Sequence, residues 1–111
     1  MKVTDLWSKI ESLVPQDSDQ NLEIIRKAKI VTCFFSQKLI SQVSISFSKN
    51  YIRFYWMIAE DDAYIEVSNL KISFVIMNLG AKFSNEVPFS STGIINAVEK
   101  IENFLGIRKE A

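Results

Sequence analysis

The residue types that usually carry acid–base or metal chemistry are scarce in this chain. Its 111 residues include no histidine and a single cysteine, Cys33, so the commonest general base and the commonest metal ligand are missing. The densest group of carboxylates is the run Glu60-Asp61-Asp62, with Glu66 close by. As a calcium loop, this run lacks ligands at alternating positions and the glycine that follows them. We therefore interpret it as a solvated hairpin turn that offers an acidic contact to a basic partner, and we predict a non-catalytic protein without a metal site or cofactor.

Two other groups of residues could carry chemistry, but both have simpler structural explanations. Cys33 lies in an apolar run, residues 30–35, where free cysteine usually packs as a small hydrophobic residue. A nucleophilic cysteine normally needs a histidine to deprotonate it, and the chain has none. Arg26, Lys27 and Lys29 resemble a phosphate-binding patch, but cations are also favoured at the C-terminal end of a helix. We predict a buried thiol and a solvated helix end.

Bulk composition excludes several classes of protein. Hydrophobic residues make up 48% of the chain and charged residues 23%, which is typical of one globular domain spanning residues 1–111. A single cysteine excludes an internal disulfide and indicates a reducing compartment. There is no apolar run of roughly 20 residues for a membrane span, and residues 1–7 do not look like a signal peptide. We expect a cytoplasmic protein that does not contact a membrane.

Helical spacing of apolar residues predicts helices at both ends of the chain. The first is capped by Thr4 and ends before Pro15, and the second is capped by Asp17 and ends near Lys29. A last helix begins at Ser90 or Ser91 and ends at Gly106, with Ile107 folding back onto Ile101. These helices each present one apolar stripe.

The segment between the second helix and the middle of the chain is ambiguous. β-Branched and aromatic residues in 30–35 favour a strand, and this is our prediction. A single helix that continues through the segment to about Leu39 fits the apolar spacing as well.

The middle of the chain predicts an antiparallel meander with strands at 39–48, 51–59, 63–68 and 71–78. A two-residue turn at Lys49-Asn50 pairs Val43, Ile45 and Phe47 with Trp56, Phe54 and Ile52. A turn at Asp61-Asp62 pairs Trp56 with Val67 and Met57 with Glu66. A turn at Asn69-Leu70 pairs Ile65 with Phe74. Residues 80–89 are read as a loop or a short irregular strand.

These elements predict an α+β fold with two layers. An antiparallel meander of four to five strands packs through one apolar face onto the N-terminal and C-terminal helices. The apolar face has these members: Val43, Ile45, Phe47, Ile52, Phe54, Trp56, Ile58, Ile65, Val67, Ile72, Phe74 and Ile76.

The opposite side of the sheet, which we call the outer face, carries the residue types that dominate protein interfaces. Tyrosine, arginine and methionine are enriched at interfaces, and tyrosine and arginine supply many of their strongest contacts. We predict a partner-binding site made of these residues: Tyr51, Arg53, Tyr55, Met57, Tyr64, Glu66 and Lys71. The competing explanations are an ordinary solvent-facing sheet, a cover formed by residues 80–89, and a homodimer through the outer face.

A small chain with no catalytic motif and one predicted protein-binding face is typical of an inhibitor that acts by binding its target. Our leading hypothesis is an intracellular protein-binding module, such as an immunity protein that neutralises a toxin by binding it. One alternative is a small enzyme or ligand carrier that uses Arg53, Tyr64 and Glu66 in a polar site. Another is weak binding of single-stranded nucleic acid through stacking on tyrosines. Equal numbers of basic and acidic residues, 13 of each, make nucleic acid the less favoured partner.

Overall fold

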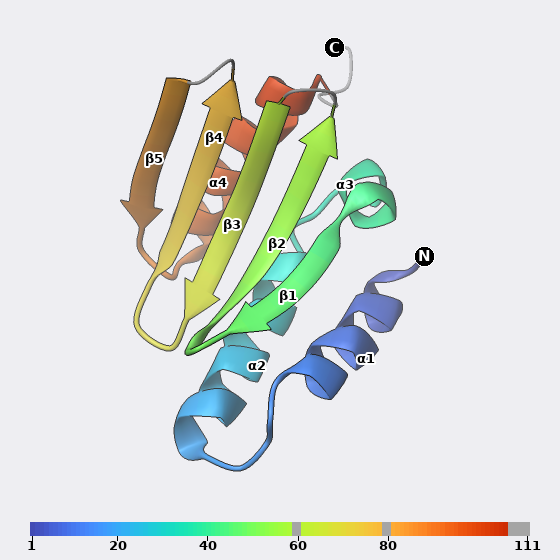
Figure 1. Cartoon of the computed structure of the whole chain (residues 1–111), viewed down its shortest axis with the longest axis vertical. Coiled ribbons are helices and arrows are strands. Elements are labelled where there is room, and N and C mark those ends of the chain that lie inside the picture. The colour runs from blue at the N-terminus through green and yellow to red at the C-terminus, as the bar shows by residue number, and fades with distance from the viewer. Residues whose placement is uncertain (59–60, 79–80, 107–111) are drawn as a thin grey trace.

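The computed structural model describes residues 1–58, 61–78 and 81–106, and it has two layers. The helices are α1 (Val3–Leu13), α2 (Asp19–Thr32), α3 (Gln37–Gln42) and α4 (Ser91–Leu105). The strands are β1 (Ser44–Ser48), β2 (Tyr51–Ile58), β3 (Asp61–Ser68), β4 (Ile72–Asn78) and β5 (Ala81–Val87). Helices α2 and α4 pack behind the sheet, and α1 packs against α2 and β1 (Figure 1). The predicted α+β fold, with an antiparallel sheet packed on terminal helices, is confirmed.

At the start of each long helix, a side chain accepts a hydrogen bond from a free backbone N–H group. At α1, the predicted Thr4 cap is wrong, because Lys2 is the cap residue and its own N–H donates to Asp5 Oδ2 at 2.7 Å. At α2, the predicted Asp17 cap is also wrong, because the Ser18 hydroxyl accepts from the Asn21 N–H at 3.1 Å.

The last helix follows its prediction closely. Ser90 caps the start of α4, and Gly106 ends it in the left-handed conformation with φ of 70°. The predicted contact of Ile107 lies outside the described residues. Gly93, in the first turn, is required for a close approach, since a Cβ there would lie 2.2 Å from the Pro88 carbonyl oxygen.

The predicted strand over residues 30–35 is wrong, because α2 continues to Thr32. Ile24, Ala28 and Val31 recur at helical spacing and are buried, so tertiary packing overrides the β-propensity of the segment. The chain then forms the short helix α3, whose Leu39 and Ile40 are buried. The predicted strand 39–48 is therefore shortened to β1, and Val43 ends α3 instead of pairing with Trp56.

The sheet order is β1-β2-β3-β4-β5, with every neighbouring pair antiparallel. The predicted registers at Lys49-Asn50 and at Asn69-Leu70 are confirmed. The predicted turn at Asp61-Asp62 is wrong, because Ile58 pairs with Asp61 and not with the predicted Ile65, four residues further along. This even-numbered shift keeps every side chain on its predicted face. Residues 81–87 form a complete strand, within the segment predicted to be a loop or a short irregular strand.

The core lies between the sheet and the helices. Its largest side chains include Phe54, Trp56 and Phe74 from the sheet. Phe35, which follows α2, meets Phe54 and Trp56 edge-on with ring centroids 5.3 and 5.4 Å apart. The Trp56 indole N–H donates to the Leu39 carbonyl at 3.0 Å, which ties α3 to β2. Of the predicted apolar face, Val43, Ile45, Phe47 and Ile76 are only partly buried.

Candidate functional site

The structure brings the predicted partner-binding residues together on the outer face. Tyr51, Arg53, Tyr55 and Met57 alternate along β2, and Tyr64 and Glu66 stand opposite Tyr55 and Arg53 on β3. No described helix lies on this side of the sheet, which faces the viewer in Figure 1. Met57 is 68% exposed. The expectation that residues 80–89 cover the outer face is not met by the described part of that segment, because β5 adds to the sheet edge.

Arg53 is the centre of the site, and its guanidinium is held from several directions. Its Nε and Nη2 donate to Glu66 Oε2 at 2.9 and 2.5 Å. Its Nη2 also donates to the Tyr51 hydroxyl at 3.4 Å. The guanidinium carbon lies 4.3 Å from the centre of the Tyr64 ring, within the range of a cation–π contact. The position of the guanidinium is therefore set by contacts within the chain.

The electrostatics of Arg53 reflect two opposing effects. Partial burial disfavours the charged guanidinium, whereas the hydrogen bond and the charge of Glu66 favour it. The carboxylate wins, so the pKa of Arg53 is raised above its ordinary value. The side chains of Arg53 and Glu66 are 35% and 23% exposed, so a partner could still reach both.

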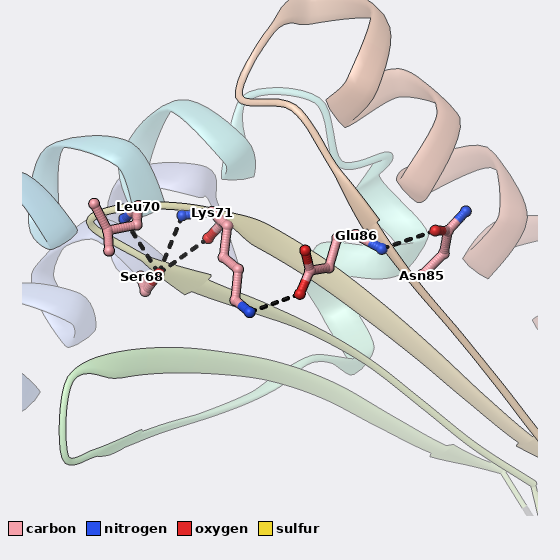
Figure 2. Close-up of polar contacts among 5 residues, drawn as sticks. All are labelled: Ser68, Leu70, Lys71, Asn85 and Glu86. Carbon is pink, nitrogen blue, oxygen red and sulfur yellow. Dashed lines mark hydrogen bonds and ion pairs between the residues drawn. The ribbon is translucent and has the colours of Figure 1, made fainter.

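Lys71 is held at the far end of the outer face by a second ion pair. Its Nζ lies 2.6 Å from Glu86 Oε2 (Figure 2). The hydrogen bond that Lys71 donates to Glu86, and then the negative charge of Glu86, raise the pKa of Lys71. Figure 2 also shows the Ser68 hydroxyl accepting from the backbone N–H groups of Leu70 and Lys71. Lys71 is thus positioned both by the β3–β4 turn and by β5.

The surface of the outer face is shaped by three shallow depressions. One of about 340 Å³ is lined by Arg53, Tyr55, Met57 and Tyr64. A second, of about 300 Å³, lies over Tyr51 and the β3–β4 turn. A third, of about 540 Å³, spreads from Tyr64 to β5. The outer face is therefore uneven but open, a shape that suits contact over a wide area, and Arg53 lies near its centre.

The acidic run does not form the predicted turn. Asp61 and Asp62 are the first residues of β3, so their side chains point to opposite faces of the sheet. Asp62 joins the outer face opposite Met57, and Glu60 lies outside the described residues. Within residues 1–58, 61–78 and 81–106, no three cysteine or carboxylate side chains are grouped so that they could hold a metal ion.

The prediction of a buried cysteine is wrong. Cys33 is exposed and is the residue that ends α2. Its Sγ donates to the Lys29 carbonyl at 3.4 Å. The predicted solvated cluster at the end of α2 is partly engaged: Lys27 donates to the Asn69 carbonyl at 2.6 Å, and Lys29 pairs with Glu11. Trp7, in α1, is only partly buried, and its indole N–H donates to Thr32 Oγ1 at 2.9 Å.

Sequence reasoning missed the Arg53–Glu66 pair because it placed the β2–β3 turn two residues late. That register set Met57 opposite Glu66, whereas the structure sets Arg53 there. A signal was present in the sequence. Pairing Ile58 with Asp61 keeps the apolar face intact and also places the opposite charges of Arg53 and Glu66 directly across the strands, which stabilises a sheet.

Comparisons with known proteins leave the site to be judged on its own chemistry. No protein-family model matches the chain, and no curated protein or solved structure gives a match. Among the described residues, no helix has the length and apolar character needed to cross a membrane.

Proposed function

We propose that the chain is a non-catalytic, intracellular protein-binding module that docks on another protein through its outer face. The observation that carries this proposal is the arginine fixed between Glu66 and the Tyr64 ring, at the centre of a face that no described helix covers. Binding is favoured when a contact residue is already ordered, because less conformational freedom is lost on association.

The composition of the site supports a protein as the partner. Tyr55 and Tyr64 provide flat, partly exposed rings, and Met57 provides an adaptable apolar side chain beside them. Arginine and tyrosine are frequent among residues whose truncation costs most binding energy. On the β1 side, the polar residues Ser44, Ser46 and Ser48 border this centre, as polar residues border many interfaces.

The alternatives receive less support from the same geometry. Binding of nucleic acid would rely on Arg53 and Lys71, but each cation is already paired with a carboxylate of this chain. A ligand carrier or enzyme would use a deep pocket, whereas the depressions over Arg53 and Tyr64 are open and shallow.

In its finer form, the proposal is an immunity protein that neutralises a toxin encoded beside its own gene. The test is calorimetric titration of the chain with the product of the neighbouring gene. The Arg53→Glu and Tyr55→Ala variants should each lose at least about tenfold in affinity, the loss expected at a central contact.

The matched control for Arg53→Glu is Lys100→Glu, a charge reversal on the exposed side of α4 in the other layer. This control should bind as the unmodified chain does. If the neighbouring product does not bind, the immunity proposal is wrong. If a partner binds equally well to Arg53→Glu and to Lys100→Glu, the outer face is not the docking surface.

A further inference from the structure

Strand β5 is an open edge of the sheet. It is the last strand in the sheet order, and every residue from Ala81 to Glu86 is exposed. The opposite edge differs, because β1 is shorter and α1 packs against it (Figure 1). An open edge carries unpaired backbone N–H and C=O groups, which form a template for another strand.

The side chains of β5 divide cleanly between the two sides of the sheet. Lys82, Ser84 and Glu86 lie on the outer face, opposite Met77, Val75 and Ser73. Phe83 and Asn85 lie on the helix side. Phe83 is 50% exposed although its ring lies 5.8 Å from that of Phe74. The edge thus combines one cation, one anion and an aromatic ring that the helix layer does not cover.

We infer that β5 pairs antiparallel with β5 of a second copy of the chain, about a two-fold axis at Ser84. Ser84 is the middle residue of Ala81–Val87, so this register pairs the whole strand. It places Lys82 directly opposite Glu86 of the second copy, and Glu86 opposite Lys82 of the second copy. Opposite charges at directly facing positions stabilise an antiparallel pair. The edge is therefore complementary to itself.

Other two-fold registers are less favourable. In a symmetric pair, the axis passes through one residue, which then faces its own equivalent. An axis at Lys82 or Glu86 sets like charges against each other, which destabilises the pair. An axis at Phe83 or Asn85 leaves both charges without an opposite partner and leaves residues at the strand ends unpaired. Length and charge thus select the same register.

Two contacts of β5 bear on this pairing. The Glu86 backbone N–H donates to Asn85 Oδ1 at 2.9 Å, so a bond from this N–H to the second copy would replace that contact (Figure 2). Lys71 donates to Glu86 Oε2, which leaves the carboxylate's Oε1 for the lysine of the second copy. On the helix side, Phe83 would stand diagonal to Phe83 of the second copy, at about 7–8 Å, a spacing that aromatic side chains can bridge. Pairing would cover both exposed rings.

This inference does not rest on the proposed function, because it uses a different surface. Facing residues of an antiparallel pair point to the same side, so both sheets would turn their outer faces in one direction. The sites around Arg53 would stay uncovered in both copies.

The first test is sedimentation equilibrium over a concentration series that extends to the solubility limit. The unmodified chain should show a dimer. Lys82→Glu and Glu86→Lys should each weaken dimerisation by at least about tenfold, because facing charges become alike. An equimolar mixture of these two variants should recover the dimer, since each glutamate then faces a lysine of the other variant.

Matched controls are Glu99→Lys and Lys100→Glu, which reverse exposed charges on α4 and should leave the dimer unchanged. Far-ultraviolet circular dichroism checks that each variant is folded. A chain that stays monomeric throughout the series overturns the proposal. A dimer that survives both β5 reversals, or a mixture that fails to recover it, also overturns it.

The second test locates the axis by crosslinking in a Cys33→Ser background. Facing residues of an antiparallel pair have Cα atoms about 4.5–5.5 Å apart, which suits a disulfide. Ser84→Cys should therefore form a disulfide-linked dimer under mild oxidation. Ser73→Cys and Ser46→Cys, on the outer face but away from the edge, should not form a disulfide-linked dimer. Crosslinking through these positions instead of Ser84 would indicate a face-to-face dimer and overturn the edge pairing.

Discussion

The two faces of the sheet are built from the same strands but do different work. Phe54 and Tyr55 are neighbours on β2, yet Phe54 is fully buried between the layers and Tyr55 is only partly covered. On the helix side, close packing holds the side chains, whereas on the outer face an ion pair and ring contacts hold them. Val75 shows that residue type does not decide burial alone: it lies on the outer face between Tyr64 and Ser84 and is 6% exposed. The comparison assigns stability mainly to one face and leaves the other available for binding.

Truncating adjacent residues on opposite faces of the sheet tests most directly whether the two faces differ in their contribution to stability. Phe54→Ala should lower the free energy of unfolding by about 3–5 kcal/mol, because it leaves a cavity in the core. Tyr55→Ala should lower it by no more than about 1 kcal/mol, the range of cross-strand contacts. Urea denaturation measures both values. Equal losses would show that the outer face carries as much stability as the core.

Removal of a polar contact within the core should cause the next largest loss in the free energy of unfolding. Trp56→Phe removes the donor to the Leu39 carbonyl and leaves that acceptor without its partner in the buried region. We expect a loss of about 1–3 kcal/mol in the free energy of unfolding. Trp7→Phe is the control, since its indole donates in a less buried place and its loss should be smaller. The reverse ranking would contradict the role of Trp56 in joining α3 to β2.

The Arg53–Glu66 pair should contribute less than either core group. Because the arginine side chain is 35% exposed, solvent screens the attraction, and we expect a coupling energy of at most about 1 kcal/mol. A double-mutant cycle with Arg53→Gln and Glu66→Gln measures it by chemical denaturation. A much larger coupling energy would show that the Arg53–Glu66 pair mainly stabilises the fold.

The smallest effect should come from the exposed Lys71–Glu86 pair. The pKa of Lys71 is higher in the folded chain than its ordinary value. Its contribution to stability is therefore complete below the unfolded pKa and disappears as the pH rises through the folded pKa. Lys71→Gln should lower the melting temperature slightly at neutral pH, and the difference from the unmodified chain should vanish in strongly alkaline buffer. A difference that persists there, or that ignores added salt, would require another origin.

Much of the sheet could be predicted from the sequence because side chains alternate along a strand. Two of the three predicted turns have the observed register. The turn at Asp61-Asp62 failed because aspartate favours turns in general, whereas Asp61 and Asp62 begin β3. Residues 80–89 could be predicted only as a loop or a short irregular strand, because they carry no strong apolar alternation. The exposed edge position of β5 explains why none was needed.

The sequence predicted which side of the sheet each candidate site residue lies on, but it did not predict the contacts between them. All members of the outer face fell on the correct side, because an even error in register does not exchange the faces. The partner of Arg53 was lost through the same error. Residues 30–35 failed for a different reason: burial of Val31 and Phe35 against distant residues decided the conformation, and local propensity does not contain that information.

The positions of the two tryptophans give this protein a pair of built-in optical reporters. Trp56 is 1% exposed and sealed between the layers, so its fluorescence should be blue-shifted and shielded from dissolved quenchers. Trp7 is partly open to solvent, with the Lys29 ammonium 5.9 Å from its ring, so acrylamide should reach it first. Single-tryptophan variants would therefore report separately on whether α1 leaves the domain and whether the sheet parts from its helices, without any attached dye.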